Sequence, residues 1–199
     1  MDRPDLDYVE GQFRESIAVK QSIVEDAALM QQVTSIGHLL IDRYREGSKL
    51  LIAGNGGSAA DAQHIAAEFV SRFNFDRPGL PSLALTTDTS ILTAVGNDYG
   101  YEQLFRRQLQ ANGVAGDVFL GISTSGNSPN VLEALRACAD LGITAIGLTG
   151  ASGGKMRDLC DHCICVPSQD TPRIQESHLL IGHTLCAMVE LALFDKPGQ

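Results

Sequence analysis

Short apolar runs alternate with longer segments of helical spacing along most of the chain. The runs lie at 49–54, 82–86, 117–123, 144–150 and 163–167. Their apolarity is continuous, which is typical of strands covered on both faces, and the helix-length segments between them imply parallel pairing through helical crossovers. The sequence therefore predicts an α/β fold, a three-layer αβα sandwich around a five-stranded parallel sheet.

Helical spacing also precedes the first run, in residues 5–46. One or two long helices therefore precede the sheet, and apolar helix surface outside the strand–helix units must be buried somewhere, which suggests contact with another subunit. We expect one domain over 1–199, with N-terminal helices used in oligomerisation at 1–47 and the sheet core at 48–199.

The last long segment begins at Thr171 and is mostly apolar for more than twenty residues, with a few charged residues among them. Thr171 is a plausible N-cap, and Pro172 suits the first helical position because it needs no hydrogen bond from its nitrogen there. This pattern predicts a C-terminal helix that is mostly buried.

The formal net charge of -9, without any run of Lys and Arg, argues against sequence-independent binding of nucleic acid. An anionic substrate must therefore be held locally. The first residues, MDRPDLDYVEGQFRES, are acidic and polar where a secretory signal would be basic and then apolar, and no stretch approaches 18 uncharged apolar residues. We therefore expect a cytoplasmic protein that binds neither nucleic acid nor membrane.

The chain has five cysteines, an odd number that favours reduced thiols over a disulfide framework: Cys138, Cys160, Cys163, Cys165 and Cys186. The cluster CDHCIC suggests a metal site, but no second cysteine pair completes four ligands. Because free cysteine often behaves as a small buried apolar residue, a buried strand is the expected alternative.

Four small hydroxyl residues follow the third run: Ser123, Thr124, Ser125 and Ser128. In open α/β sheets ligands bind beyond the carboxyl ends of the strands. Ser128 and Pro129 resemble an N-cap and a first helical residue, and the free N–H groups and positive dipole end of a helix favour an anion. The loop therefore suggests a phosphate site without Lys or Arg. An ordinary capped turn is the alternative, but it explains only Ser128.

A glycine-rich loop follows the first run, with Gly54, Gly56 and Gly57 allowing a tight turn and Ser58 placed to cap the next helix. The third glycine is misplaced for a dinucleotide fingerprint, and the Gly-Lys-Ser/Thr of a P-loop is missing. Neither nucleotide-binding motif is therefore indicated.

His64 and Glu68 stand four residues apart in the helix after that loop, so they share one face. Such a pair either lies on an ordinary surface or serves a metal or catalytic site. The alanines around it indicate a helix that packs closely and encloses the pair at least in part. Gln175 and His183 are further polar groups, two turns apart in the apolar C-terminal segment.

Five segments together resemble the phosphoheptose isomerases of the sugar isomerase (SIS) superfamily: GNGGSAADAQHIAAEF, LTTDTSILTAVGNDYGYEQLF, GDVFLGISTSGNSPNV, GLTGASGGKM and TPRIQESHLLIGH. The resemblance covers nearly the whole chain. It implies a flavodoxin-like SIS fold, a homotetramer with active sites at subunit interfaces, and one zinc per subunit. The implied reaction converts sedoheptulose 7-phosphate to D-glycero-D-manno-heptose 7-phosphate through an enediol, the first step towards ADP-heptose for lipopolysaccharide.

The resemblance also implies residue roles. The phosphate would be held by Ser123, Thr124, Ser125 and Ser128, and the sugar by Asn55, Gly56, Gly57, Ser58, Asn97 and Asp98, with Arg72 and Asp170 close by. His64, Glu68, Gln175 and His183 match the zinc ligands, and Glu68 and Gln175 also border the substrate. Glu68 and His183 match the acid/base pair. A zinc-bound Glu is a poorer base, so the sequence leaves open whether Glu68 is ligand, base or both.

Two other functions remain possible. The SIS superfamily includes isomerases of other sugar phosphates, and loop hydroxyls recognise a phosphate without measuring the carbon chain. It also includes a non-enzymatic adaptor in replication initiation, in which the residues matching Glu68 and His183 are replaced. Both are present here, which argues against the adaptor.

Overall fold

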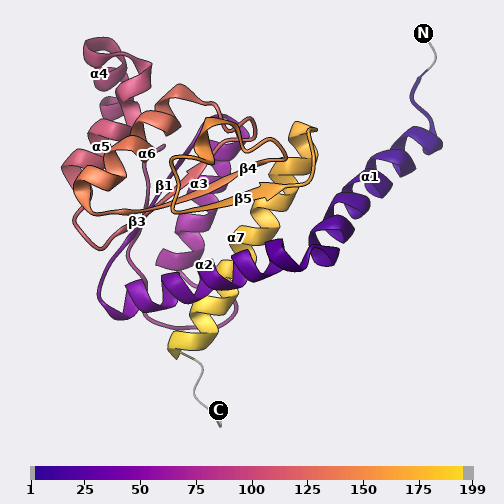
Figure 1. The fold of residues 1–199 in the computed structure, drawn as a ribbon, viewed down its shortest axis with the longest axis horizontal. Coiled ribbons are helices and arrows are strands. Elements are labelled where there is room, and N and C mark those ends of the chain that lie inside the picture. The colour runs from indigo at the N-terminus through magenta and orange to yellow at the C-terminus, as the bar shows by residue number, and fades with distance from the viewer. Residues whose placement is uncertain (1–2, 195–199) are drawn as a thin grey trace.

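The computed structural model describes residues 3–194, with a five-stranded parallel sheet as its middle layer (Figure 1). The strands are β1 (Leu50–Gly54), β2 (Ser82–Ala84), β3 (Val118–Ile122), β4 (Thr144–Gly150) and β5 (His162–Val166). Their order across the sheet is β2-β1-β3-β4-β5, the flavodoxin-like order. The predicted fold class is confirmed, although β2 ends two residues earlier than its apolar run.

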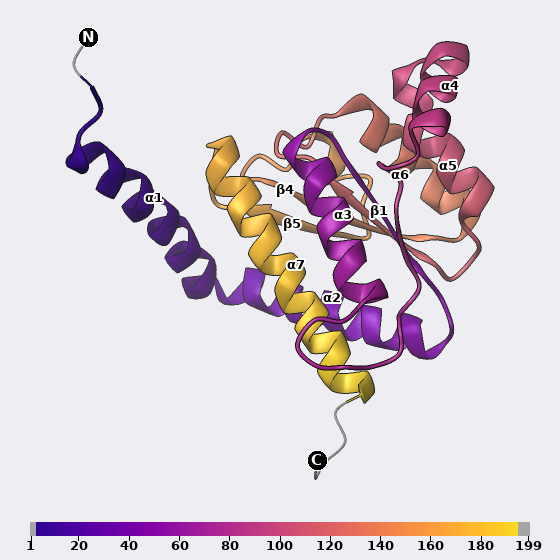
Figure 2. The same cartoon turned by 180° about the vertical axis from the view of Figure 1, so that it is seen from behind.

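The helices are α1 (Leu6–Glu25), α2 (Ala27–Arg45), α3 (Gly57–Val70), α4 (Thr89–Tyr99), α5 (Leu104–Asn112), α6 (Pro129–Leu141) and α7 (Thr171–Phe194), with short 3₁₀ turns η1 (Tyr101–Gln103) and η2 (Gly154–Met156). Five of them cover the two faces of the sheet. One apolar core joins α2, α3 and α7 to the sheet, and the other joins α5 and α6. Figures 1 and 2 show these two helical layers from opposite sides.

The alternation of side chains along β1 explains its continuous apolarity. Leu50 and Ile52 belong to the core beneath α2, α3 and α7, whereas Leu51 and Ala53 belong to the core beneath α5 and α6. All four are fully buried. Because successive side chains point to opposite faces and both faces are covered, a central strand needs apolar residues at every position.

The two N-terminal helices have different surroundings. Val33 and Ile36 of α2 are buried in the same core as the sheet, so α2 belongs to the sandwich. Helix α1 projects from the body (Figures 1 and 2) and leaves Leu6, Phe13 and Ile17 exposed. Most of α1 therefore stands outside the core, and only its last turns reach it, through the buried Ile23.

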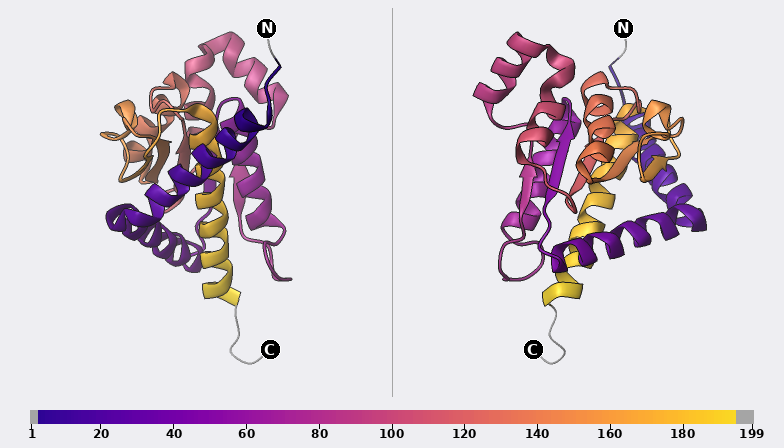
Figure 3. Two further views of the ribbon diagram at one scale, coloured as in Figure 1. Left: turned by 90° about the vertical axis from the view of Figure 1, so that its right-hand side faces the viewer. Right: turned by 60° about the vertical axis from the view of Figure 1, so that its left-hand side comes forward.

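Helix α7 packs against α2 and α3, and its C-terminal end lies at the opposite end of the molecule from α4 (Figure 3). It is long and apolar enough to cross a membrane by length and composition, but Ile181 and Leu185 are buried in the core. Leu180 stays exposed, so the helix is less buried than predicted. The Asp170 carbonyl accepts from Ile174 N–H, which makes Asp170 the N-cap, one residue before the predicted Thr171.

His178 is fully buried on α7, and its imidazole Nε2 donates to the Thr149 carbonyl at 3.2 Å. Burial lowers the pKa of His178 to about 4. On acidification, the His178 imidazole therefore becomes protonated at higher pH in the unfolded chain than in the folded chain. The neutral imidazole contributes its full stability above the ordinary pKa of histidine, and this contribution is lost as the pH falls towards the pKa of the folded state.

We expect the free energy of unfolding to fall by about 2 kcal/mol through His178 alone between about pH 7.5 and about pH 5. Urea unfolding at the two pH values measures this loss. His178→Gln removes the titrating group, so its loss on acidification should be smaller. An equal loss in both proteins would show that His178 does not cause it.

Candidate functional site

Three titratable side chains from α3 and α7 meet on the surface where these helices lie side by side (Figure 2). His64 Nε2 lies 3.1 Å from Glu68 Oε1 and 3.1 Å from His183 Nε2. The three possible ligand atoms all lie within 4.8 Å of one another. The structure therefore brings together three of the four side chains that the sequence suggested as metal ligands.

A glycine lets the two helices approach at this point. A Cβ added to Gly182 would lie 2.6 Å from Ile65 Cδ1, closer than real side chains pack. Because Gly182 precedes His183 and Ile65 follows His64, this contact sets the two imidazoles opposite each other. The ring of Phe73 packs on His183 with centroids 5.4 Å apart.

The His64–Glu68–His183 cluster has the donor set that zinc prefers, two imidazoles and a carboxylate. With Zn–N bonds of about 2.1 Å and tetrahedral angles, two histidine nitrogens on one zinc lie about 3.4 Å apart. The two Nε2 atoms here lie 3.1 Å apart, and the His64 side chain is 44% exposed. These residues therefore fit a metal ion that is reachable from solvent.

Gln175, the fourth suggested ligand, contacts the start of α3. A Cβ added to Gly57 would lie 2.5 Å from Gln175 Nε2, so the amide packs on the Gly57 backbone. Gln175 thus lies two turns before His183 on α7, beside the glycine-rich loop. Its participation in a metal site stays a prediction.

The serine-rich loop forms a cluster of hydroxyls at the start of α6. Ser123 Oγ lies 2.8 Å from Ser128 Oγ and 3.4 Å from Ser125 Oγ. Ser128 is the N-cap and Pro129 the first helical residue, as predicted, but the Ser128 side chain makes no capping hydrogen bond. The hydroxyls therefore bond to one another, and the Val131 N–H in the first turn of α6 donates to Asn130 Oδ1 at 3.0 Å instead. The hydroxyl cluster lies at the positive end of the helix dipole, where an anion is favoured.

Thr124 and Ser125 also line a pocket of about 370 Å³ at the carboxyl ends of β3 and β4, together with Ser152 and Ser168. Thr124 is half-buried and Ser125 is exposed. All four hydroxyl residues suggested by the sequence thus border one region of the carboxyl edge, where ligands bind in this fold.

Asn55 links the glycine-rich loop to the start of α6, directly after the serine-rich loop. Its amide exchanges two hydrogen bonds with the Asn130 amide, at 2.9 and 2.8 Å, and Tyr101 donates to Asn55 Oδ1 at 3.1 Å. This link joins the loop after β1 to the helix that follows β3, and β1 and β3 are the two strands at which the strand order reverses. A pocket of about 400 Å³ lies beside it, lined in part by Asn55 and Tyr101.

Asn130 and Tyr101 were not suggested as site residues by the sequence. Asn130 is 2% exposed on the inward face of α6. A polar amide at the second position of a helix, directly after Ser-Pro, is the signal that could have identified it. Tyr101 had no such signal, because its partner Asn55 lies 46 residues away.

The start of α3 differs from the prediction. The helix begins at Gly57 with Gly56 as N-cap, and Gly56 has a φ of 55°, which side chains rarely adopt. Ser58 is a buried residue of the first turn. The expectation that Ser58 caps the helix is therefore wrong, and the glycine takes the cap because of its backbone conformation.

Four other suggested residues lie on the surface. Asn97 Nδ2 donates to Asp98 Oδ1 at 2.7 Å on exposed α4, Arg72 follows α3, and Asp170 Oδ2 lies 3.5 Å from Arg173 Nε. Within residues 3–194, no hydrogen bond or ion pair connects these four to the His64–Glu68–His183 cluster. Their contact with substrate stays a prediction.

Comparisons with known proteins agree with this fold. A family model described as SIS domain matches residues 12–150. The chain is 65% identical to a phosphoheptose isomerase of Aneurinibacillus thermoaerophilus, covering 94% of this chain and 95% of that protein. A phosphoheptose isomerase structure from Neisseria gonorrhoeae matches with a TM-score of 0.86 at 43% identity over 92% of this chain and 97% of its own. One from Francisella tularensis matches with a TM-score of 0.89 at 37% identity over 94% and 98%.

A parallel β2-β1-β3-β4-β5 sheet with hydroxyl and amide groups at its switch point, together with the matching family model, defines an SIS-domain protein. Because the chain is 65% identical to a phosphoheptose isomerase over nearly its full length, this SIS-domain protein is an enzyme. The chain belongs to the phosphoheptose isomerase family of SIS-domain proteins.

Proposed function

We propose that the protein interconverts sedoheptulose 7-phosphate and D-glycero-D-manno-heptose 7-phosphate, the first step towards ADP-heptose for lipopolysaccharide. The observation that carries this proposal is the His64–Glu68–His183 cluster, which offers a carboxylate and an imidazole within hydrogen-bond distance on adjacent helices. The family membership of the chain supports the choice of a heptose 7-phosphate.

The phosphate is held at the start of α6. Hydroxyls of Ser123, Ser125 and Ser128 lie together there, and the start of the helix adds the positive end of its dipole. No lysine or arginine is required, because charge-assisted hydrogen bonds to an oxyanion are about twice as strong as neutral ones. Binding at this loop fixes one end of the sugar phosphate.

The isomerisation moves one proton between C1 and C2 and another between their oxygens, through a cis-enediol. The Glu68 carboxylate takes the carbon-bound proton and returns it to the neighbouring carbon. The His183 imidazole moves the proton between the two oxygens. Each general acid or base contributes about 10²–10⁴ in rate.

We further propose that His64, Glu68 and His183, with Gln175, hold one zinc ion per subunit. The fit of the three clustered side chains supports this proposal. When bound, zinc polarises the substrate carbonyl and contributes several kcal/mol to stabilising the developing charge. Metal analysis of the purified protein tests the assignment, with His64→Ala expected to hold much less zinc than the wild type.

We propose a cytoplasmic homotetramer that binds neither nucleic acid nor membrane. The exposed residues Leu6, Val9, Phe13 and Ile17 of α1 recur at helical spacing on the helix that projects from the core, and such apolar surface is typical of an interface. The net charge of -9 disfavours nucleic acid. Sedimentation equilibrium should give the mass of four chains; a monomer would contradict the proposal.

A coupled assay with sedoheptulose 7-phosphate beside fructose 6-phosphate tests the function. We expect rapid turnover of the heptose phosphate and little of the hexose phosphate, and slower turnover after zinc chelation. Preference for the hexose would indicate an isomerase of another sugar phosphate. No turnover of either by zinc-loaded protein would favour the non-enzymatic adaptor.

A further inference from the structure

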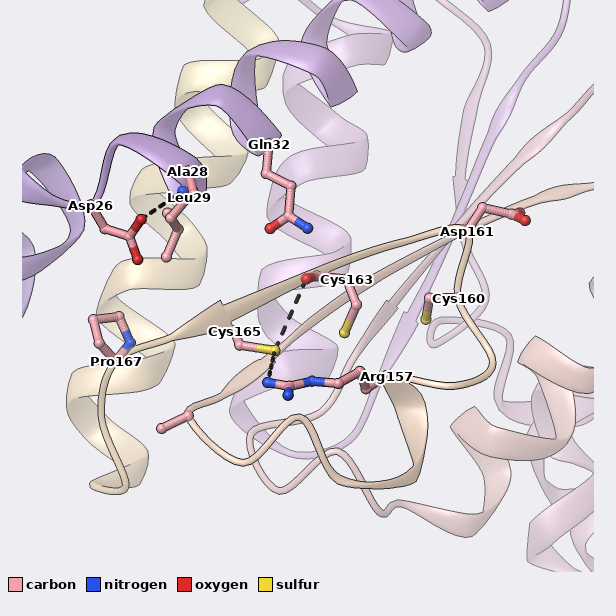
Figure 4. Close-up of a pocket in the computed structure, with 11 residues that line it drawn as sticks. Asp26, Ala28, Leu29, Gln32, Arg157, Cys160, Asp161, Cys163, Cys165 and Pro167 are labelled. Carbon is pink, nitrogen blue, oxygen red and sulfur yellow. Dashed lines mark hydrogen bonds between the residues drawn. The ribbon is translucent and has the colours of Figure 1, made fainter.

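Three cysteines line an open pocket of about 660 Å³ at the edge of the sheet formed by β5 (Figure 4). Cys160 precedes the strand, and Cys163 and Cys165 lie within it. All three are half-buried, so the expectation of a fully buried strand is wrong for this face. Arg157 lines the same pocket and donates to Cys165 Sγ at 3.4 Å.

Strand geometry determines which thiols can join. Cys163 and Cys165 lie two residues apart on one face of β5, about 6.6 Å along the strand, whereas a disulfide needs Cβ atoms about 3.8 Å apart. Cys160 is differently placed, because it lies outside the strand. A Cβ added to Gly147 would lie 2.7 Å from Cys160 Sγ and 3.3 Å from Cys163 Sγ. Both sulfurs therefore occupy the space that this glycine leaves.

The surroundings also divide the two thiols into different protonation states. The Cys160 thiol donates a hydrogen bond to the Cys163 sulfur, which lowers the pKa of Cys163 to about 7. Burial opposes this shift, whereas Cys165 and Arg157 add to it. The same hydrogen bond and burial raise the pKa of Cys160. Near neutral pH, Cys163 is thus partly thiolate, the reactive form, beside a protonated neighbour.

We propose that Cys160 and Cys163 form a dithiol site that hydrogen peroxide oxidises to a reversible disulfide. The Cys163 thiolate attacks one peroxide oxygen, the O–O bond breaks, and hydroxide leaves and takes up a proton as water. The resulting sulfenic acid is attacked by the Cys160 sulfur, which forms the S–S bond, and a second water leaves with the thiol proton. Peroxide is thereby reduced by two electrons and the dithiol oxidised by two.

The segment that carries Cys160 touches the serine-rich loop. Lys155 N–H donates to Asn127 Oδ1 at 3.1 Å, and Met156 N–H donates to the Gly126 carbonyl at 3.1 Å. A disulfide of about 2.05 Å draws Cys160 towards β5 and displaces this segment. If the loop binds the substrate phosphate, which rests on the proposed function, oxidation should raise KM severalfold and leave kcat nearly unchanged.

Peptide mapping after mild peroxide treatment and alkylation of the zinc-loaded protein tests the site. We expect a Cys160–Cys163 disulfide that a dithiol reductant reverses, and Cys160→Ser should instead accumulate a sulfenic acid at Cys163 that dimedone traps. Cys165→Ser is the matched control and should still form the disulfide. The buried Cys138 and Cys186, whose pKa burial raises to about 12, provide internal references for unreactive thiols.

The proposed dithiol site would be overturned if Cys163 were oxidised no faster than Cys138. It would also be overturned if the disulfide formed to Cys165 instead of between Cys160 and Cys163. This mapping needs no substrate, so it is independent of the proposed reaction: a protein that forms the disulfide but turns over no sugar phosphate contradicts only the latter. In an active protein, a KM that is equal before and after oxidation would refute the link to the serine-rich loop. A severalfold rise in KM on oxidation of the wild type, but not of Cys160→Ser, would support it.

Discussion

Replacing Glu68 by Gln is expected to lower kcat/KM for sedoheptulose 7-phosphate by about 10²–10⁴. Gln keeps the size and one oxygen of the side chain but cannot accept a proton from carbon. Because Glu68 is 24% exposed at the end of α3 and makes its side-chain contact with His64 at 3.1 Å, the fold should not depend on its charge. The measurement is steady-state turnover, with circular dichroism to compare the folds.

Metal content separates the two possible roles of Glu68. A Glu68→Gln protein that holds zinc but has lost turnover identifies the carboxylate as the base, whereas one that has lost zinc as well identifies it as a ligand. Glu46→Gln is the matched control, because it neutralises an exposed helix-end carboxylate paired with Arg43. Turnover by Glu68→Gln close to that of the control would remove Glu68 from the chemistry.

The fold could be predicted from the sequence because the sheet is buried on both faces. Every residue of β1 and β3 is buried, so the strands appear as uninterrupted apolar runs. The shared face of His64 and Glu68 was likewise readable from helical spacing. The ends of helices and strands were predicted less accurately. Ser58 was expected to be the N-cap of α3 because its side chain suits that role, but Gly56 is the N-cap because of its backbone conformation.

The meeting of His64 with His183 could not be derived from spacing, because 119 residues separate them and only the packing of α3 on α7 joins them. Family resemblance supplied that pairing. The same limit hid the Asn55–Asn130 link, because its two amides lie 75 residues apart, one in the loop after β1 and the other in the first turn of α6. Contacts across the carboxyl edge depend on strand order, and hydrophobic periodicity does not determine strand order.

A buried ion pair below the site was also missed by the sequence. Arg77 Nε lies 3.1 Å from Glu190 Oε1, and the two side chains are 2% and 1% exposed. Glu190 accepts further from the N–H groups of Phe73 and Asn74, and Arg77 donates to the Glu68 carbonyl. The pair therefore fastens α7 to the segment after α3 and holds the end of the helix that carries Glu68.

Removing one member of this pair leaves a buried charge without its partner. We expect Arg77→Met to lower the free energy of unfolding by about 3–5 kcal/mol, measured by urea titration. The double variant Arg77→Met with Glu190→Met should lose less than the two single changes added together, since neither charge is then left alone. Glu10→Gln breaks an exposed pair with Arg14 and should cost about 0.5 kcal/mol or less. If Arg77→Met costs no more than this control, the buried pair does not hold α3 and α7 together, and the positions of Glu68 and His183 must depend on apolar packing alone.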